Sequence, residues 1–142
     1  MMSVSALFTN VFNYFAAQLP AALAAVGSTA PLTKNWRAGW WNLLGNDSFP
    51  CGFLMVHAGK PDEVSVYAMQ DHVAASIYWV VKDKNPNLAA LLVVDAFKEM
   101  VMADMHLGGA CVLAEISDWA IGTDEQLSSV AVLKLDMEIL IQ

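Results

Sequence analysis

Nucleophilic, acid–base or metal chemistry would depend on a few scattered side chains. They are His57, His72, His106, Cys51 and Cys111. None of them follows a metal-ligand spacing such as CxxC or HExxH. Asp71-His72 has the residue types of a general base and an orienting carboxylate, although such neighbours are common by chance. The sequence also lacks P-loop, GxSxG and GxGxxG motifs. We therefore predict no catalytic, cofactor-binding or metal site and no enzymatic activity.

The cysteines lie in apolar sequence, which favours reduced core thiols of a cytoplasmic protein over a disulfide. The acidic pair Asp124-Glu125 has too few neighbouring oxygen ligands for a Ca²⁺ site. We place Asp118, Asp124 and Glu125 at or beside one hairpin turn that projects from the sheet. Charges there are easily solvated, and a partner could contact them.

Three of the five tryptophans lie in the irregular stretch 28–50, namely Trp36, Trp40 and Trp41. Their indoles either fold back on the protein's own core or anchor a neighbouring subunit, because tryptophan is enriched at interface hot spots. We expect Trp40 or Trp41 in the core. We expect Trp36, flanked by Lys34 and Arg37, at a subunit boundary.

The length and composition are those of one globular domain spanning residues 1–142. The chain has 57% apolar and 15% charged residues, a net charge of −7, and Arg37 as its one arginine. This balance argues against nucleic-acid binding, which requires clustered cations. Polar residues interrupt each apolar stretch before it reaches membrane-spanning length. No basic residue precedes Lys34, so we expect no secretory signal.

Two helices are predicted from apolar periodicity. The first runs from about Ser5 to Val26 and ends at Gly27, and Pro20 should kink or split it near 17–19. The second begins with Asn85 as cap, has Pro86 in its first turn, and reaches about Met105. It is apolar nearly all round, so we expect burial on more than one side and self-association through a cyclic, head-to-tail interface.

Strands are predicted from alternation. They cover 52–57, 63–68, 72–82, 110–119 and 127–141, with a turn at 59–62 and a bulge near Ala131. The expected fold is α+β. A mixed, mostly antiparallel sheet of about four to five strands is packed by the N-terminal and central helices.

The layout resembles the tail terminator and minor tail proteins of long-tailed bacteriophages. The similarity lies in His72–Val81 (HVAASIYWVV), in the apolar helix ending Ala103–Gly109 (ADMHLGG), and in the strand Val132–Ile141. It spans nearly the whole chain through element order and hydrophobic pattern. The Trp36–Trp41 segment departs from the family pattern.

The resemblance implies a structural role without cofactors. Subunits would form a ring, commonly a hexamer, that caps the tail tube and presents a surface to head-completion proteins. The partners would be other copies of the chain, the tail tube protein and a head-completion protein. The location would be the host bacterial cytoplasm during assembly and then the virion tail. Acidic charge would let DNA pass, since like charges repel. The alternatives are another head–tail connector or tail-completion protein, or a small-molecule-binding α+β domain.

Overall fold

A computed structural model describes residues 3–46, 48–65, 68–124 and 127–141, and these form an α+β fold, as predicted. The elements are α1 (Val4–Ala25), the short 3-10 helix η1 (Thr33–Asn35), β1 (Trp36–Ala38), β2 (Cys51–Ser65), β3 (Ala68–Lys82), α2 (Pro86–Ala103), β4 (Leu113–Asp124) and β5 (Leu127–Ile141). The strands form one mixed sheet in the order β1-β2-β3-β5-β4. The β1–β2 pair is parallel, and the other neighbouring pairs are antiparallel.

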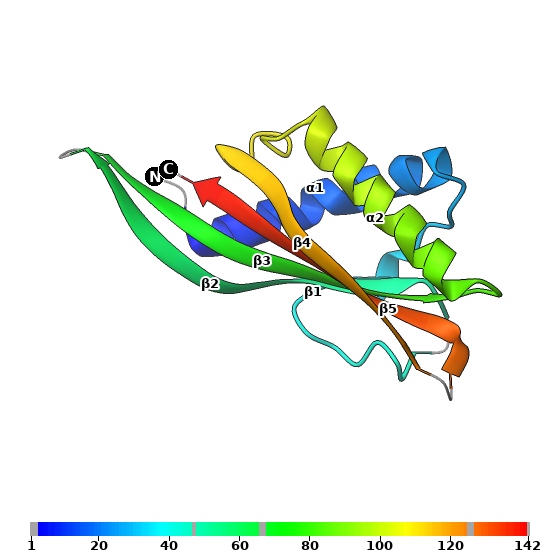
Figure 1. Ribbon diagram of the computed structural model, residues 1–142. Coiled ribbons are helices and arrows are strands. Elements are labelled where there is room, and N and C mark those ends of the chain that lie inside the picture. Colours follow the sequence, from blue (N-terminus) through cyan, green and yellow to red (C-terminus); the bar gives the residue numbers. More distant parts are fainter. Residues whose placement is uncertain (1–2, 47, 66–67, 125–126, 142) are drawn as a thin grey trace.

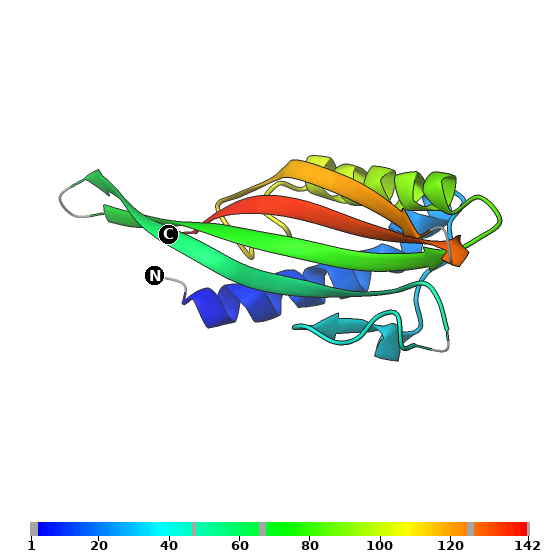
Figure 2. The ribbon, with the colours of Figure 1, turned by 60° about the horizontal axis from the view of Figure 1, so that its bottom comes forward.

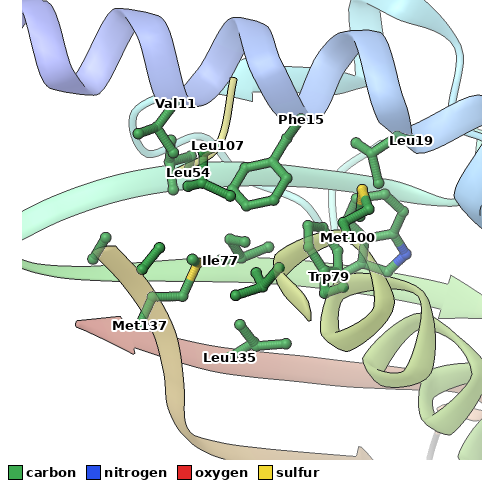
Figure 3. Close-up of a cluster of buried hydrophobic side chains, with 14 of the residues drawn as sticks. Val11, Phe15, Leu19, Leu54, Ile77, Trp79, Met100, Leu107, Leu135 and Met137 are labelled. Atoms are coloured by element: carbon green, nitrogen blue, oxygen red, sulfur yellow. The ribbon is translucent and has the colours of Figure 1, made fainter. Parts of the chain in front are cut away.

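Both helices lie on the same face of the sheet (Figure 1). The main core lies between them and the sheet and includes Phe15 of α1 and Trp79 of β3 (Figure 3). Both rings contact Phe97, with ring centroids 5.3 and 5.7 Å away. We call the opposite side of the sheet the open face, because no helix of the described residues packs on it (Figure 2). Residues 39–46 and 48–50 cover only one end of it. The molecule therefore has one fully covered sheet face and one largely uncovered one.

Helix α1 is continuous through Pro20, so the split is wrong, and the alternative of a kink there stays a prediction. Its buried residues lie on both sides of the proline and are Leu7, Val11, Phe15, Leu19 and Leu23. Burying this stripe offsets the roughly 3 kcal/mol that an interior proline costs. The predicted end at Gly27 is confirmed. Gly27 has a φ of +76°, and the amide of Ser28 donates to the carbonyl of Leu23, as in a Schellman motif.

Helix α2 begins as predicted, with the Asn85 side chain accepting a hydrogen bond from the amide of Leu88. It ends at Ala103, slightly before the expected Met105. Its inner side packs against α1 and the sheet and buries Ala90, Val93, Val94, Ala96, Phe97, Met100 and Val101. Leu88 and Met102 remain exposed. The burial of α2 on more than one side, which the sequence predicted, is thus provided largely by α1 and the sheet of the same chain.

The turn predicted at 59–62 is wrong, because β2 runs without a turn from Cys51 to Ser65. β1 pairs only with Gly52–Leu54, so the rest of β2 is an edge strand, where the missing amide of Pro61 is tolerated. The β2–β3 hairpin extends beyond β5, whose last pair with β3 is Asp71↔Ile141 (Figure 1). The strand predicted at 52–57 and residues 63–65 of the next predicted strand therefore belong to one strand, while Ala68 is the first residue of β3 and residues 66–67 lie outside the described part of the chain.

The predicted inward faces of β3 and β5 are confirmed. Core residues from the two strands alternate as expected and are Val73, Ala75, Ile77, Trp79, Val81, Leu133, Leu135, Met137, Ile139 and Ile141. The bulge expected near Ala131 is absent from the β3–β5 pairing, although the β4–β5 register shifts just beyond this residue. Val130 and Val132 have the opposite parity because they pack on the open face, in a second cluster with Leu43 and Phe53.

Candidate functional site

Trp36 is a core residue, which corrects its predicted place at a subunit boundary. Its side chain is 5% exposed. It stacks on Phe12 at 5.5 Å and lies 5.8 Å from Trp79, while its indole N–H donates to the carbonyl of Phe12 at 3.5 Å. β1 places this indole beneath α1, where aromatic contacts and burial stabilise it. The cations that flank Trp36 in the sequence suggested an exposed position, so the sequence did not indicate this burial.

Trp40 is the tryptophan that remains available to a partner, since 73% of it is exposed. Trp41 is half-buried. Its indole N–H donates to the carbonyl of Gly52 at 3.1 Å, and the Arg37 guanidinium lies 3.9 Å from its ring centroid. Trp40, Trp41 and Leu44 line an apolar recess of about 340 Å³ on the open face. Of the three predicted interface tryptophans, Trp40 has the exposure that an anchor needs.

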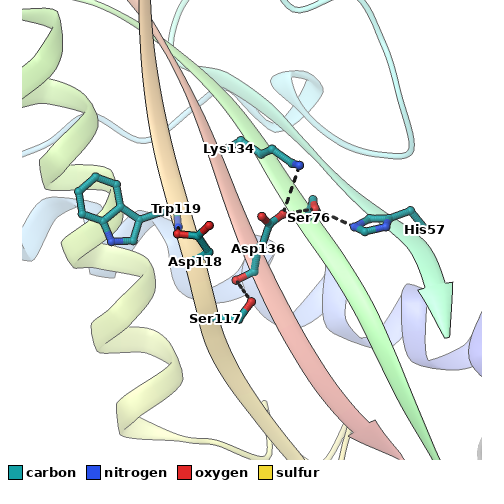
Figure 4. Close-up of polar contacts among 7 residues, drawn as sticks. All are labelled: His57, Ser76, Ser117, Asp118, Trp119, Lys134 and Asp136. Carbon is teal, nitrogen blue, oxygen red and sulfur yellow. Dashed lines mark hydrogen bonds and ion pairs between the residues drawn. The ribbon is translucent and has the colours of Figure 1, made fainter. Parts of the chain in front are cut away.

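Of the three acidic residues expected at or beside one hairpin turn, Asp118 lies away from the end of its strand. Asp118 lies within β4, opposite Asp136 of β5, and its carboxylate accepts a hydrogen bond from the amide of Trp119 (Figure 4). Asp124 is the last residue of β4, and Glu125 lies outside the described residues. β4 continues past the expected turn because it stays paired with β5 through Asp124.

The open face carries pairs of like charges across β4 and β5. Asp118 is directly opposite Asp136, and Glu115 is directly opposite Glu138. Lys134 makes an ion pair with Asp136 at 3.7 Å. In the described part of the chain, Glu115 and Glu138 have no ion pair. Like charges directly opposite each other destabilise a sheet, so these pairs oppose folding of the chain.

Neutralising one member of each pair should therefore stabilise the protein. We expect Glu115→Gln with Asp118→Asn to raise the free energy of unfolding by about 0.2–1 kcal/mol per pair. The gain should shrink in high salt, which screens exposed charges. Thermal melting of dilute protein at low and high ionic strength measures both effects. A lower melting temperature than wild type in low salt would show that the carboxylates do not repel each other.

A hydrogen-bonded chain crosses three strands beside these pairs. The Ser76 hydroxyl is fully buried and donates to Asp136 Oδ1 at 2.6 Å (Figure 4). His57 Nε2 lies 2.9 Å from the same hydroxyl. The one hydroxyl proton points to Asp136, so His57 donates and Ser76 accepts. Sequence reasoning missed this chain, although alternation does place Ser76 and Asp136 on the same side of their strands.

The order of the three residues in this hydrogen-bonded chain determines what they can do chemically. In a nucleophilic triad the histidine lies between serine and carboxylate, where it removes the serine proton. Here the serine lies between the other two, and its proton is already held by Asp136. The arrangement is suited to fixing the register of β2, β3 and β5 by satisfying a buried hydroxyl.

The thiols are buried and free, as predicted. Burial, together with the smaller effect of the nearby Asp104 carboxylate, raises the pKa of Cys111 to about 11. Burial also raises the pKa of Cys51. Both groups are therefore protonated and weakly nucleophilic near neutral pH. Among the residues described, no three His, Cys, Asp or Glu side chains are grouped so as to hold a metal ion.

Comparison with known proteins adds no assignment. The chain matches no protein-family model, and no curated protein matches its sequence significantly. In the parts of the chain that the structure describes, neither helix is long and apolar enough to cross a membrane.

Proposed function

We propose that the protein is a structural component of phage assembly, a tail terminator. Its copies form a ring that ends the growing tail tube and presents a surface to the head. The resemblance in sequence layout suggests this role. The observation that carries it is the open face, where a packed domain leaves a sheet uncovered beside repelling carboxylates and the exposed Trp40. Such a surface is suited to assembly with protein partners.

An acidic open face also agrees with a ring through which DNA passes. The four carboxylates of the two cross-strand pairs are accompanied there by Lys134. Negative charge disfavours phosphate contacts, so DNA would slide past without binding. A connector protein elsewhere at the head–tail junction would share this property. The experiment must therefore separate tube capping from head binding.

Tube capping tests the proposal directly. Purified protein added to polymerising tail tube protein should stop elongation, giving shorter tubes with extra density at one end in electron micrographs. Tube protein with an equal mass of an unrelated acidic protein is the control. Binding to head–connector complexes without an effect on tube length would assign the protein to another connector role. No effect on tubes and no binding to heads would contradict a head–tail role altogether.

A further inference from the structure

Opposite edges of the sheet carry opposite charges. β1 lies at one edge, and its Arg37 and the nearby Lys34 are exposed. β4 lies at the other edge, and its Glu115 and Asp118 are exposed. The chain as a whole is acidic, so a cationic edge is not a consequence of average composition. The segregation gives each copy two complementary surfaces on opposite sides.

Arg37 and Asp118 belong to the same side of the sheet. Arg37 pairs with Phe53, whose ring stacks on Tyr78 on the open face, and its guanidinium covers the Trp41 ring. Asp118 pairs with Asp136, which accepts the proton of Ser76 on that same face (Figure 4). Placing two copies edge to edge with their open faces aligned would bring the cations beside the carboxylates.

Exposed apolar side chains accompany both edges. Trp40 and Leu44 follow β1, while Leu113 and Trp119 lie on β4. Large apolar groups beside complementary charges are the usual composition of a protein interface. The repulsion of Glu115 with Glu138, and that of Asp118 with Asp136, which Lys134 relieves only in part, add a reason for a cationic partner at the β4 edge.

We propose that the β4 edge of one copy binds the β1 edge of the next, head to tail. Lys34 and Arg37 of one copy face Glu115 and Asp118 of its neighbour. β1 has only three residues, so side chains contribute more to this contact than strand hydrogen bonds. The contact uses different surfaces on the two copies and can therefore repeat until a ring closes. The inference rests on the proposed function in requiring self-association, and it specifies the surfaces.

Charge reversal with complementation tests the pairing. One variant carries Glu115→Lys and Asp118→Lys, and the other carries Lys34→Glu and Arg37→Glu. Alone, each places like charges at the contact and should remain monomeric. An equimolar mixture restores opposite charges at every contact, so the mass by light scattering should return to that of the wild-type oligomer. This recovery should weaken as salt increases.

A matched control carries Lys82→Glu and Lys84→Glu, the same charge change at the turn between β3 and α2. It should assemble like the wild type. Circular dichroism verifies that each variant is folded. If a reversal unfolds the chain, the neutral pair Glu115→Gln with Asp118→Asn and the pair Lys34→Gln with Arg37→Gln replace it. Each neutral pair should then weaken assembly compared with the wild type.

Three results would overturn the proposal. They are a wild type that stays monomeric at its highest soluble concentration, variants that assemble normally, and a mixture of folded variants that stays monomeric. A tube-capping assay distinguishes failure of this edge-to-edge contact from failure of the proposed function. If the wild type caps tubes while the mixture stays monomeric, the edge assignment is wrong and the terminator role stands. If the mixture assembles while the wild type does not cap tubes, the edge assignment stands and the terminator role is wrong.

Discussion

Replacing Trp36 with alanine should lower the free energy of unfolding by about 3–5 kcal/mol, the usual cost of truncating a buried aromatic residue. The indole joins α1 to the sheet, since it stacks on Phe12 with an interplanar angle of 6° and also contacts Trp79 and Phe97. Its removal leaves a cavity where α1, α2 and β3 meet. Denaturant unfolding followed by far-UV circular dichroism measures the loss.

Trp40→Ala is the matched control, because it removes the same side chain four residues away. Trp40 is exposed, so the free energy of unfolding of this variant should stay within about 0.5 kcal/mol of that of the wild type. Tube capping by this variant should be impaired, since an exposed aromatic residue is the usual anchor of an interface. Equal destabilisation by the two substitutions would contradict the division into one core and one surface tryptophan.

Gly52→Ala should destabilise the protein by about 1–3 kcal/mol through overpacking. A Cβ atom at Gly52 would lie 2.6 Å from the Trp79 ring and 2.7 Å from the carbonyl oxygen of Tyr78. The backbone contact cannot be relieved by a side-chain rotation, so β2 and β3 must separate locally. Gly52 also pairs with Trp36, so a shift there disturbs the β1 edge as well. The melting temperature reports the effect.

Gly122→Ala provides the comparison for this substitution. Gly122 is also a strand glycine, but a Cβ atom there would meet nothing within 4 Å. Its backbone does not have a positive φ. We expect its stability to stay within about 0.5 kcal/mol of wild type, or to rise slightly because alanine restricts the unfolded chain. If Gly52→Ala melts at the same temperature as Gly122→Ala, the close approach at Gly52 is not a constraint.

Local periodicity was enough to predict several elements correctly. β5 has the expected bounds, and β3 buries the side of the strand that alternation indicated. The cap at Asn85 and the stop at Gly27 were also readable, because capping depends on residues within one turn of the helix end. In each of these cases the deciding interactions lie close together in the chain.

Other features depended on what the neighbouring elements are. Pro61 predicted a turn, yet it lies in a strand because β1 leaves most of β2 as an edge. Val130 and Val132 predicted a bulge, which the structure has only as a register shift between β4 and β5. Against β3 they alternate regularly, because Leu43 and its neighbours form a second apolar cluster with them on the open face. The same residues are compatible with either structure until the neighbouring elements are known.

The sequence by itself determined the α+β class, the helix ends and the inward faces of the principal strands. Only the tertiary structure decided which tryptophan is buried, and only it joined Ser76 to His57 and Asp136, which are 19 and 60 residues away. The physical reason is the range of the interactions. Strand alternation and caps are set by adjacent residues, whereas burial and hydrogen bonding across strands depend on which distant segments the sheet order brings together.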